Sequence, residues 1–385
     1  MIWEKIPIRM LSVALLVTFN FISCQKEIDF QCQSNSKHKF VSKGFVHLDI
    51  DSLTTNRPYS LQYGRFEEKD LLSFINFHYN EIQLYDLNSG LLTKKLKFDQ
   101  NIFGEISGYF IQSLDSIFIV SSNKMKAFLV NRDLEEIQSF NLENTQGSPI
   151  PVSNLNVFYL DQKLYIINQF AINDKKGVKN ESLISVFDYS RYQENGNFDT
   201  FSFLSFPEIY DEPYSPELGL YFPAVDFQNR NLYLSFSVSH TLFKYSTSNH
   251  ALDSQFEMKP SEAFKIESSK RKNISQFVDR QLYYLENHNY GNIVFDPFQN
   301  LLFRLAYYPV DDAQSIMANS REILKRRKLL VSNLGDYQLE LETCLDQDLY
   351  YEGLMIGTPL GMLINKYSND EDKILFEIFK VEKSN

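Results

Sequence analysis

The feature that most constrains how this chain can fold is a short unit that recurs about every 45 residues in its N-terminal half. The clearest copy, DSIFIVSSNKMKAFLVNRD, runs from Asp115 to Asp133 and contains an apolar run (IFIV), a polar turn and a second apolar run (AFLV). Runs of β-branched and aromatic residues bounded by Asp, Asn and Ser are typical of paired strands. Neighbouring copies begin at Asp70 and Asp161, 45 residues before and 46 residues after Asp115. The repeat therefore predicts an all-β protein.

Three further copies follow and begin at Asn229, Asn300 and Gly353. They are spaced more widely because of insertions at residues 173–180, 207–223 and 311–328. A period of about 45 residues is the length of a four-stranded blade, and evenly repeated short strands favour radial repetition over a sandwich. We predict a six-bladed β-propeller in which a strand around Phe45 completes the last blade. A seven-bladed ring and two packed β domains are the alternatives.

One insertion has the periodicity of a helix, so we predict a short helical insertion near 313–328. Its apolar residues recur near helical spacing (Ile316, Met317, Ala318, Ile323, Leu324), and its other side is basic (Arg321, Lys325, Arg326, Arg327, Lys328). The basic residues either face water, as runs of like charge usually do, or bind an anionic ligand.

Residues 1–23 are predicted to be a secretory signal peptide. Lys5 and Arg9 precede an apolar core that is too short to cross a membrane. The core ends in Ser23-Cys24, which resembles a bacterial lipobox, in which Cys24 is acylated and becomes the first mature residue. An ordinary signal peptide with an incidental cysteine is the alternative.

The remaining chain divides into a polar tether at 24–39 and a single propeller domain at 40–385. A lipid on Cys24 would attach the protein to a membrane. Position 25 is Gln and not the Asp that signals inner-membrane retention in enterobacterial lipoproteins, so we expect an outer-membrane lipoprotein of the cell envelope, either periplasmic or surface-exposed. The run Gln25 to Glu27 is similar to the export tag of surface lipoproteins in Bacteroidota.

The formal net charge of −11 argues against nucleic acid as a partner, because binding phosphates requires concentrated Lys and Arg.

After acylation, Cys32 and Cys344 would be the remaining cysteines. An oxidising compartment permits a disulfide, but we expect two free thiols, because the sequence does not give the separation of their Cα atoms.

The motifs of hydrolases, P-loops and zinc sites are absent, and the six histidines lie singly. We predict no catalytic residue, no metal and no cofactor.

The best candidate for a ligand site is a polar and aromatic cluster: Tyr290, Asp296, Arg304, Tyr307 and Tyr308. Arg304 interrupts an apolar strand, LLFRLAYYP. A guanidinium there must reach solvent, pair with a carboxylate or meet an anionic ligand. A salt bridge to Asp296 across a hairpin is the structural interpretation, because buried charges are usually paired.

A second candidate is the aromatic pair Tyr214 and Tyr221, which lie near Asp211 and Glu212. Aromatic rings beside carboxylates suit stacking on sugars, although the same rings could simply cover a blade. His240, between two predicted strands, either faces the central channel or is a hairpin residue without a function.

The repeats behind a lipobox, with YGNIVFDP (290–297) running into NLLFR (300–304), resemble the DUF4221 lipoproteins of Bacteroidota. Where that family often has Tyr-Tyr-Arg, this chain has Leu302-Phe303-Arg304. The resemblance implies fold and location only, because the family has no established activity.

These observations predict a recognition or scaffolding module whose partner is an envelope protein, a glycan or a peptide, rather than an enzyme. The alternative is a hydrolase or lyase that acts on glycans or peptides at the mouth of the propeller, with Asp296 as its carboxylate and Arg304 as an electrostatic stabiliser. A third possibility is a subunit of a larger envelope complex, recognisable by an exposed apolar patch.

Overall fold

The chain forms two compact units, Met1–Cys32 and Gln33–Asn385. Cys32 is the one residue of the first unit that the computed structural model describes, so the fold below is that of the second unit. The described residues are 32, 37–56, 58–142, 157–168, 182–191, 199–207, 224–228, 230–267, 277–318 and 325–384.

The described strands form six antiparallel sheets of four strands each, so the predicted six-bladed propeller is confirmed. Blades 1 and 2 consist of β2 (Tyr59–Phe66), β3 (Lys69–Asn76), β4 (Glu81–Asp86), β5 (Leu92–Lys97), β6 (Ile106–Ser113), β7 (Ser116–Ser121), β8 (Lys126–Val130) and β9 (Glu136–Asn141). Blades 3 and 4 consist of β10 (Phe158–Leu160), β11 (Lys163–Ile167), β12 (Ile184–Asp188), β13 (Asp199–Phe203), β14 (Ala224–Gln228), β15 (Asn231–Ser235), β16 (Thr241–Ser246) and β17 (Leu252–Glu257). Blades 5 and 6 consist of β18 (Asn289–Asp296), β19 (Leu301–Tyr307), β20 (Arg327–Asn333), β21 (Leu339–Cys344), β22 (Tyr350–Thr358), β23 (Gly361–Lys366), β24 (Lys373–Lys383) and β1 (His38–Asp49).

The described helices are short. They are the 3-10 turns η2 (Phe77–Tyr79) and η3 (Tyr189–Arg191) and the α-helices α2 (Gln100–Phe103), α3 (Phe277–Glu286) and α4 (Ala313–Ala318). No described helix has the length and apolar character needed to span a lipid bilayer.

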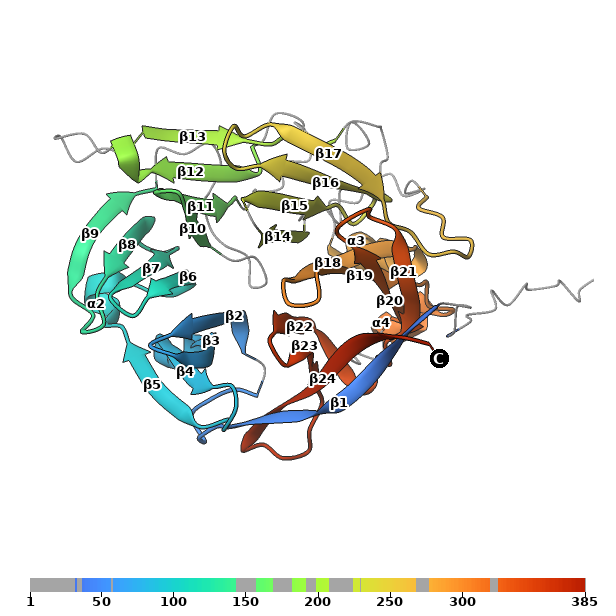
Figure 1. Cartoon of the computed structure of the whole chain (residues 1–385), viewed down its shortest axis with the longest axis horizontal. Coiled ribbons are helices and arrows are strands. Elements are labelled where there is room, and N and C mark those ends of the chain that lie inside the picture. The colour runs from blue at the N-terminus through green and yellow to red at the C-terminus, as the bar shows by residue number, and fades with distance from the viewer. Residues whose placement is uncertain are drawn as a thin grey trace, which may run out of the picture. The chain divides into compact units, whose positions relative to one another are not determined.

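The six sheets stand around a common centre, and the first strand of each sheet is the innermost: β2, β6, β10, β14, β18 and β22 (Figure 1). In five sheets the strands lie farther out in chain order, and β5, β9, β13, β17 and β21 are outermost. In the sixth sheet the order outward is β22, β23, β24 and β1, so β1 is the strand at the rim.

The last blade contains both ends of the domain. β1 pairs antiparallel with β24, in a register that runs from His38 opposite Lys383 to Asp49 opposite Lys373. The backbone N–H of Ser384 also donates to the carbonyl of Lys37 at 2.7 Å. The prediction that a strand around Phe45 completes the last blade is therefore confirmed, and this pairing closes the ring.

Apolar side chains fill the space between neighbouring blades. In β7, Ile117 and Ile119 pack in a cluster with residues of blade 1, whereas Phe118 and Val120 pack in a cluster with residues of blade 3. Successive side chains of a strand point to opposite faces, so a strand covered on both faces must be apolar at every position. This explains why the repeat contains uninterrupted apolar runs such as IFIV.

The predicted helical insertion near 313–328 is shorter than expected. α4 ends at Ala318, residues 319–324 lie outside the described residues, and Arg327 and Lys328 already belong to β20. The expectation that the basic residues face water is wrong for Lys325, Arg327 and Lys328, which are buried. Lys325 Nζ donates to the carbonyls of Tyr284 and Asn287 at 2.5 and 2.6 Å, and Lys328 Nζ lies 2.8 Å from Glu262. A run of like charges does not reveal such distant acceptors.

The prediction that Cys32 and Cys344 are free thiols is wrong, because each is disulfide-bonded. Disulfides persist mainly in oxidising compartments outside the cytoplasm, so they indicate an extracytoplasmic location.

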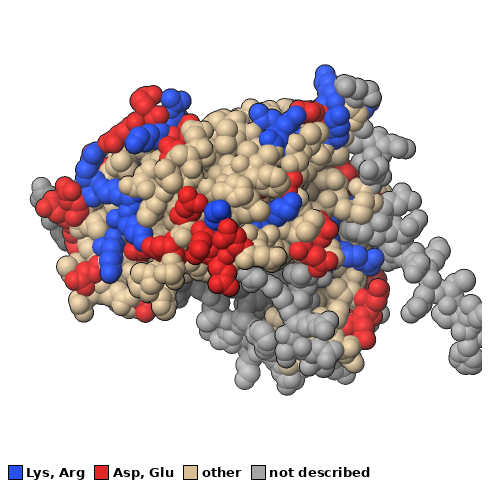
Figure 2. Space-filling model, turned by 90° about the horizontal axis from the view of Figure 1, so that it is seen from below, with Lys and Arg blue, Asp and Glu red and all other residues tan. Residues whose placement is uncertain are grey.

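Acidic and basic side chains are interspersed over the side of the molecule seen in Figure 2, and no continuous basic surface is visible there.

Candidate functional site

The inner strands of the propeller enclose two neighbouring cavities. One, of about 210 Å³, is lined by residues of β2, β14, β18 and β22. The other, of about 410 Å³, is lined by residues of blades 1 to 4 and by Ile356 of β22. They share six lining residues and together form the central channel: Leu61, Tyr63, Val225, Asp226, Phe227 and Ile356.

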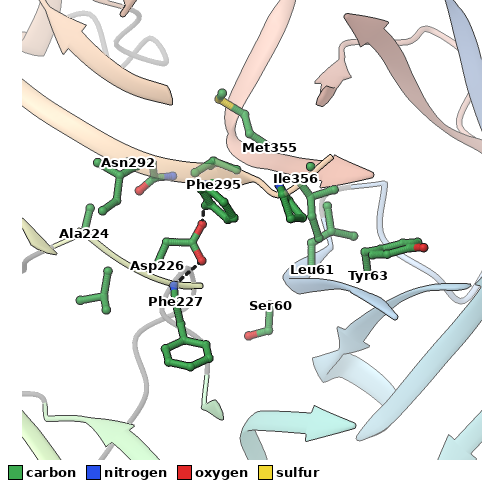
Figure 3. Close-up of a pocket in the computed structure, with 16 residues that line it drawn as sticks. Ser60, Leu61, Tyr63, Ala224, Asp226, Phe227, Asn292, Phe295, Met355 and Ile356 are labelled. Carbon is green, nitrogen blue, oxygen red and sulfur yellow. Dashed lines mark hydrogen bonds between the residues drawn. The ribbon is translucent and has the colours of Figure 1, made fainter. Parts of the chain in front are cut away.

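Asp226 is the single carboxylate among the described residues that line the channel (Figure 3). Its two oxygens accept hydrogen bonds from different strands. Oδ1 accepts the N–H of Phe227 on its own strand, and Oδ2 accepts the N–H of Phe295 on β18, both at 2.6 Å. These bonds fix the carboxylate between blades 4 and 5.

The surroundings of Asp226 oppose its ionisation. Its side chain is partly exposed and lines both cavities of the channel. Burial raises the pKa of Asp226 from 3.8 to about 6, even though the N–H groups of Phe295 and Phe227 favour the anion. A carboxyl group with a raised pKa inside a cavity is a frequent property of ligand sites.

The other polar side chains near the channel are held by neighbours. The hydroxyl of Tyr63 donates to Asp70 at 2.6 Å, and Gln62 Nε2 donates to the carbonyl of Tyr109 at 2.5 Å. Arg65, the one basic residue among the described residues of the lining, lies 3.0 Å from Glu68 through its guanidinium. Asp226 is therefore the polar group on which we centre the candidate site.

The raised pKa of Asp226 predicts how the free energy of unfolding depends on pH. Because the folded-state pKa (about 6) exceeds the unfolded value of 3.8, the folded protein binds more protons between these limits. The Asp226 contribution to the free energy of unfolding is therefore fully present below pH 4 and is lost as the pH rises through 6. We expect the difference in free energy of unfolding between wild type and Asp226→Asn to change by about 1–3 kcal/mol over this interval.

Urea unfolding of both proteins at pH 4 and pH 7 measures this difference. The carboxylates elsewhere in the chain titrate equally in the two proteins, so comparing them isolates Asp226. A constant difference between wild type and variant across this range would contradict the raised pKa.

Three of the predicted site residues form a buried cluster away from the channel. The guanidinium of Arg304 on β19 is fully buried, and its centre lies 3.4 Å from the centroid of the Tyr290 ring. The Tyr290 hydroxyl is 2.7 Å from His240 Nδ1. Burial lowers the pKa of Arg304 to about 10, so it stays charged at neutral pH. Burial, and next the charge of Arg304, also lowers the pKa of His240.

Arg304 does not have the carboxylate partner that the sequence suggested. Its Nε donates to Ser235 Oγ at 3.0 Å, Nη1 donates to the carbonyls of His240 and Met258, and Nη2 donates to those of Phe236 and Ser239. All five N–H groups are thus directed at blade 4 and the segment after it. The expected salt bridge to Asp296 is wrong. A ligand-binding role for Arg304 stays a prediction and would require one of these bonds to open.

Asp296 lies at the opposite end of β18 from Tyr290, because it pairs with Leu301 whereas Tyr290 pairs with Ala306. Its carboxylate accepts hydrogen bonds from the N–H groups of Phe298 and Gln299 and from Gln299 Nε2, so it holds the β18–β19 turn.

Tyr307 and Tyr308 are buried. The ring of Tyr308 packs edge-on against Phe264 at 5.4 Å. Tyr214 and Tyr221 lie outside the described residues, as does the proposed lipidation site Cys24. The structure therefore brings Arg304, Tyr290 and His240 together and separates them from Asp296.

Sequence reasoning missed Asp226 and its strand. AVDFQ is short and lies between the insertion at 207–223 and the repeat that begins at Asn229, so it was not assigned to a blade. A signal was present, since an Asp flanked by Val and Phe interrupts an apolar run in the same way as Arg304 interrupts its strand.

Residues 37–331 match the model of a protein family described as "Domain of unknown function (DUF4221)". A crystal structure of a member of this family from Bacteroides vulgatus covers 91% of this chain and 100% of its own, with 16% identity and a TM-score of 0.75. A Bacteroides fragilis protein named for its expected export covers 92% of this chain and 97% of its own, with 10% identity and a TM-score of 0.53. None of the proteins with curated descriptions matches this sequence.

Proposed function

This chain belongs to the DUF4221 family, and we propose that it is a lipid-anchored binding module whose ligand occupies the central channel at Asp226. The observation that carries this proposal is a carboxylate held in the wall of the central channel without a basic partner among the described residues. Placing such a group there lowers the stability of the fold. Groups kept at the expense of stability are typical of binding and catalytic sites.

The site is suited to selecting one type of small ligand. The channel walls next to Asp226 include Leu61, Phe295 and Met355, which offer apolar contact surface. The carboxylate, together with polar neighbours in the lining such as Ser60 and Asn292, would fix the orientation of a bound molecule against these apolar side chains, as in many small-molecule sites.

A thermal-shift screen of the mature chain from Gln25 onward tests this proposal, with glycans, peptides, amines and organic acids as probes. A ligand at a hundred times its dissociation constant adds about 2.7 kcal/mol to the free energy of unfolding. We expect a shift with at least one class of probe, and we expect Ile356→Trp to abolish it because the larger side chain fills the channel. Shifts that persist in this variant would place the ligand elsewhere and contradict the proposal.

The membrane attachment is proposed from the lipobox-like Ser23-Cys24 and is consistent with the disulfide-bonded cysteines and with the expected export of the Bacteroides fragilis protein. We expect Cys24→Ser to move the protein from the outer-membrane fraction to the soluble fraction, because the acyl chains on Cys24 would be its attachment to lipid.

Cell fractionation followed by detection of the protein measures this effect. Cys32→Ser is a matched control, since it removes a nearby cysteine but leaves the lipid site intact, and it should stay in the membrane fraction. If Cys24→Ser also stays there, the protein is attached in another way. Protease treatment of intact cells then distinguishes the cell surface from the periplasm.

A catalytic role is the second candidate, and the pKa of Asp226 (about 6) supports it. Such a carboxyl group can act as a general acid or base near neutral pH. However, glycoside hydrolysis usually requires two carboxyl groups, and Asp226 is alone among the channel-lining residues that the structure describes. We therefore favour binding. Turnover of a bound glycan or peptide that Asp226→Asn abolishes would favour the enzyme.

A further inference from the structure

We propose that the ligand of the central channel is a small organic ammonium ion whose charged group binds Asp226 and whose body is apolar. This inference rests on the proposed binding function of the channel and specifies the chemical class of the ligand.

The first argument is the uncompensated charge. No Lys, Arg or His in the described part of the chain forms an ion pair with Asp226. Arg65, the other charged side chain that the described part of the lining contains, is paired with Glu68. Two backbone N–H groups supply partial positive charge only. The ionised site therefore carries one uncompensated negative charge, which a monovalent cation would neutralise.

The second argument is that both oxygens of Asp226 can accept a further hydrogen bond. A carboxylate offers about four acceptor positions, and the N–H groups of Phe227 and Phe295 use one on each oxygen. Each oxygen thus keeps a position for a further donor. Asn292 and Ser60 line the same cavity (Figure 3), so it has additional polar surface beside the carboxylate. A primary ammonium group, with three N–H donors, matches this arrangement.

The third argument is the apolar wall. Phe227, Phe295, Met355 and Ile356 line the cavity around Asp226. To a metal ion, the described lining residues would offer Asp226 as their one carboxylate. Calcium prefers six to eight oxygen ligands, and the described residues contain no group of three or more His, Cys, Asp or Glu side chains that could hold a metal. An organic cation with an apolar body satisfies both the carboxylate and the wall.

Three probes of nearly equal size separate charge from shape: benzylammonium, benzyl alcohol and benzoate. We would measure their dissociation constants by calorimetry at pH 7.5 on the mature chain from Gln25 onward. Benzylammonium should bind at least tenfold more tightly than the alcohol, and benzoate should bind most weakly because Asp226 repels it.

Two variants test the assignment to Asp226. Asp226→Asn removes the charge at nearly constant size and should weaken benzylammonium binding at least tenfold while changing benzyl alcohol binding little. Asp253→Asn, on the outer strand β17 of the same blade, makes the same change in net charge and should leave all three constants unchanged. Circular dichroism checks that both variants fold. If Asp226→Asn does not fold, Asp226→Glu, which keeps the charge, and Ile356→Trp, which fills the channel, replace it. The first should retain the preference for benzylammonium and the second should abolish binding.

The outcomes separate this inference from the function on which it rests. If benzyl alcohol or benzoate binds as tightly as benzylammonium and Ile356→Trp abolishes that binding, the channel is a binding site but the ammonium inference is wrong. If benzylammonium does not bind to the folded wild type at millimolar concentration, the ammonium inference is also wrong. If benzylammonium binds equally well to Ile356→Trp, the ligand is outside the channel and both proposals fail.

Discussion

Replacing Arg304 with Met should lower the free energy of unfolding by about 4 kcal/mol or more. The five hydrogen bonds of the guanidinium end on one serine hydroxyl and four backbone carbonyls. Apolar replacement of a buried ion pair is often tolerated when both partners are replaced. Here the carbonyls belong to the backbone and cannot be removed, so Met would take the guanidinium donors away from all four. The carbonyls of His240 and Phe236 would keep the backbone N–H groups of Met258 and Ser239 as donors. The carbonyls of Ser239 and Met258 would lose the donors described above.

Urea unfolding at pH 7 measures this effect, with two comparisons. Arg304→Lys keeps the charge but offers three donors instead of five, so it should recover only part of the loss. Arg230→Met removes an exposed guanidinium that pairs with Asp161 at 3.0 Å, and it should cost less than about 1 kcal/mol. A loss of stability in Arg304→Met no larger than that in Arg230→Met would show that blade 4 does not depend on Arg304.

Removing β1 should prevent the propeller from forming a cooperative folded domain. Without this strand, β24 would be an unpaired edge of eleven residues, and Val46 and Leu48 would be missing from the cluster that joins blades 6 and 1. Long unpaired edges recruit strands from other molecules. We therefore expect the chain 50–385 to lose its sharp thermal transition and to associate.

The matched control is the chain 37–385, which also lacks Cys32 and the lipid site but retains β1. Any difference between the two proteins therefore comes from the strand. Differential scanning calorimetry measures the transition, and light scattering measures the association. If the chain 50–385 unfolds as sharply as the chain 37–385 and stays monomeric, closure by β1 is dispensable.

The sequence predicted the strands that lie in the middle of each blade better than those at the channel. β7 and β8 are covered on both faces, so they appear as apolar runs that are easy to recognise. The inner strands β10 and β14 are three and five residues long and carry polar residues such as Asp226. Short strands with mixed polarity give little periodicity, and the residues that face the channel were missed for this reason.

Arg304 shows a second reason why the sequence predicts only part of the site. Arg304 was recognisable as an anomaly, because a charge inside an apolar strand requires a partner. Its partners are mainly backbone carbonyls, 46 to 68 residues earlier in the chain. Carbonyl groups are present at every residue, so no pattern of side chains indicates which of them point at a distant arginine. Asp296 was the carboxylate that the sequence suggested, but its oxygens accept hydrogen bonds from its own turn.

The pairing of His38 with Lys383 has a consequence for the export that we propose for this protein. These residues are separated by 345 positions (383 − 38), and both belong to the closing blade. A chain exported from its N-terminus presents β1 to the new compartment first and β24 last. Until translocation ends, β1 has no partner, so the emerging protein is an open arc with exposed edges. The time between the arrival of these two strands, during which chaperones can hold the chain, therefore sets the period in which this protein is most exposed to aggregation.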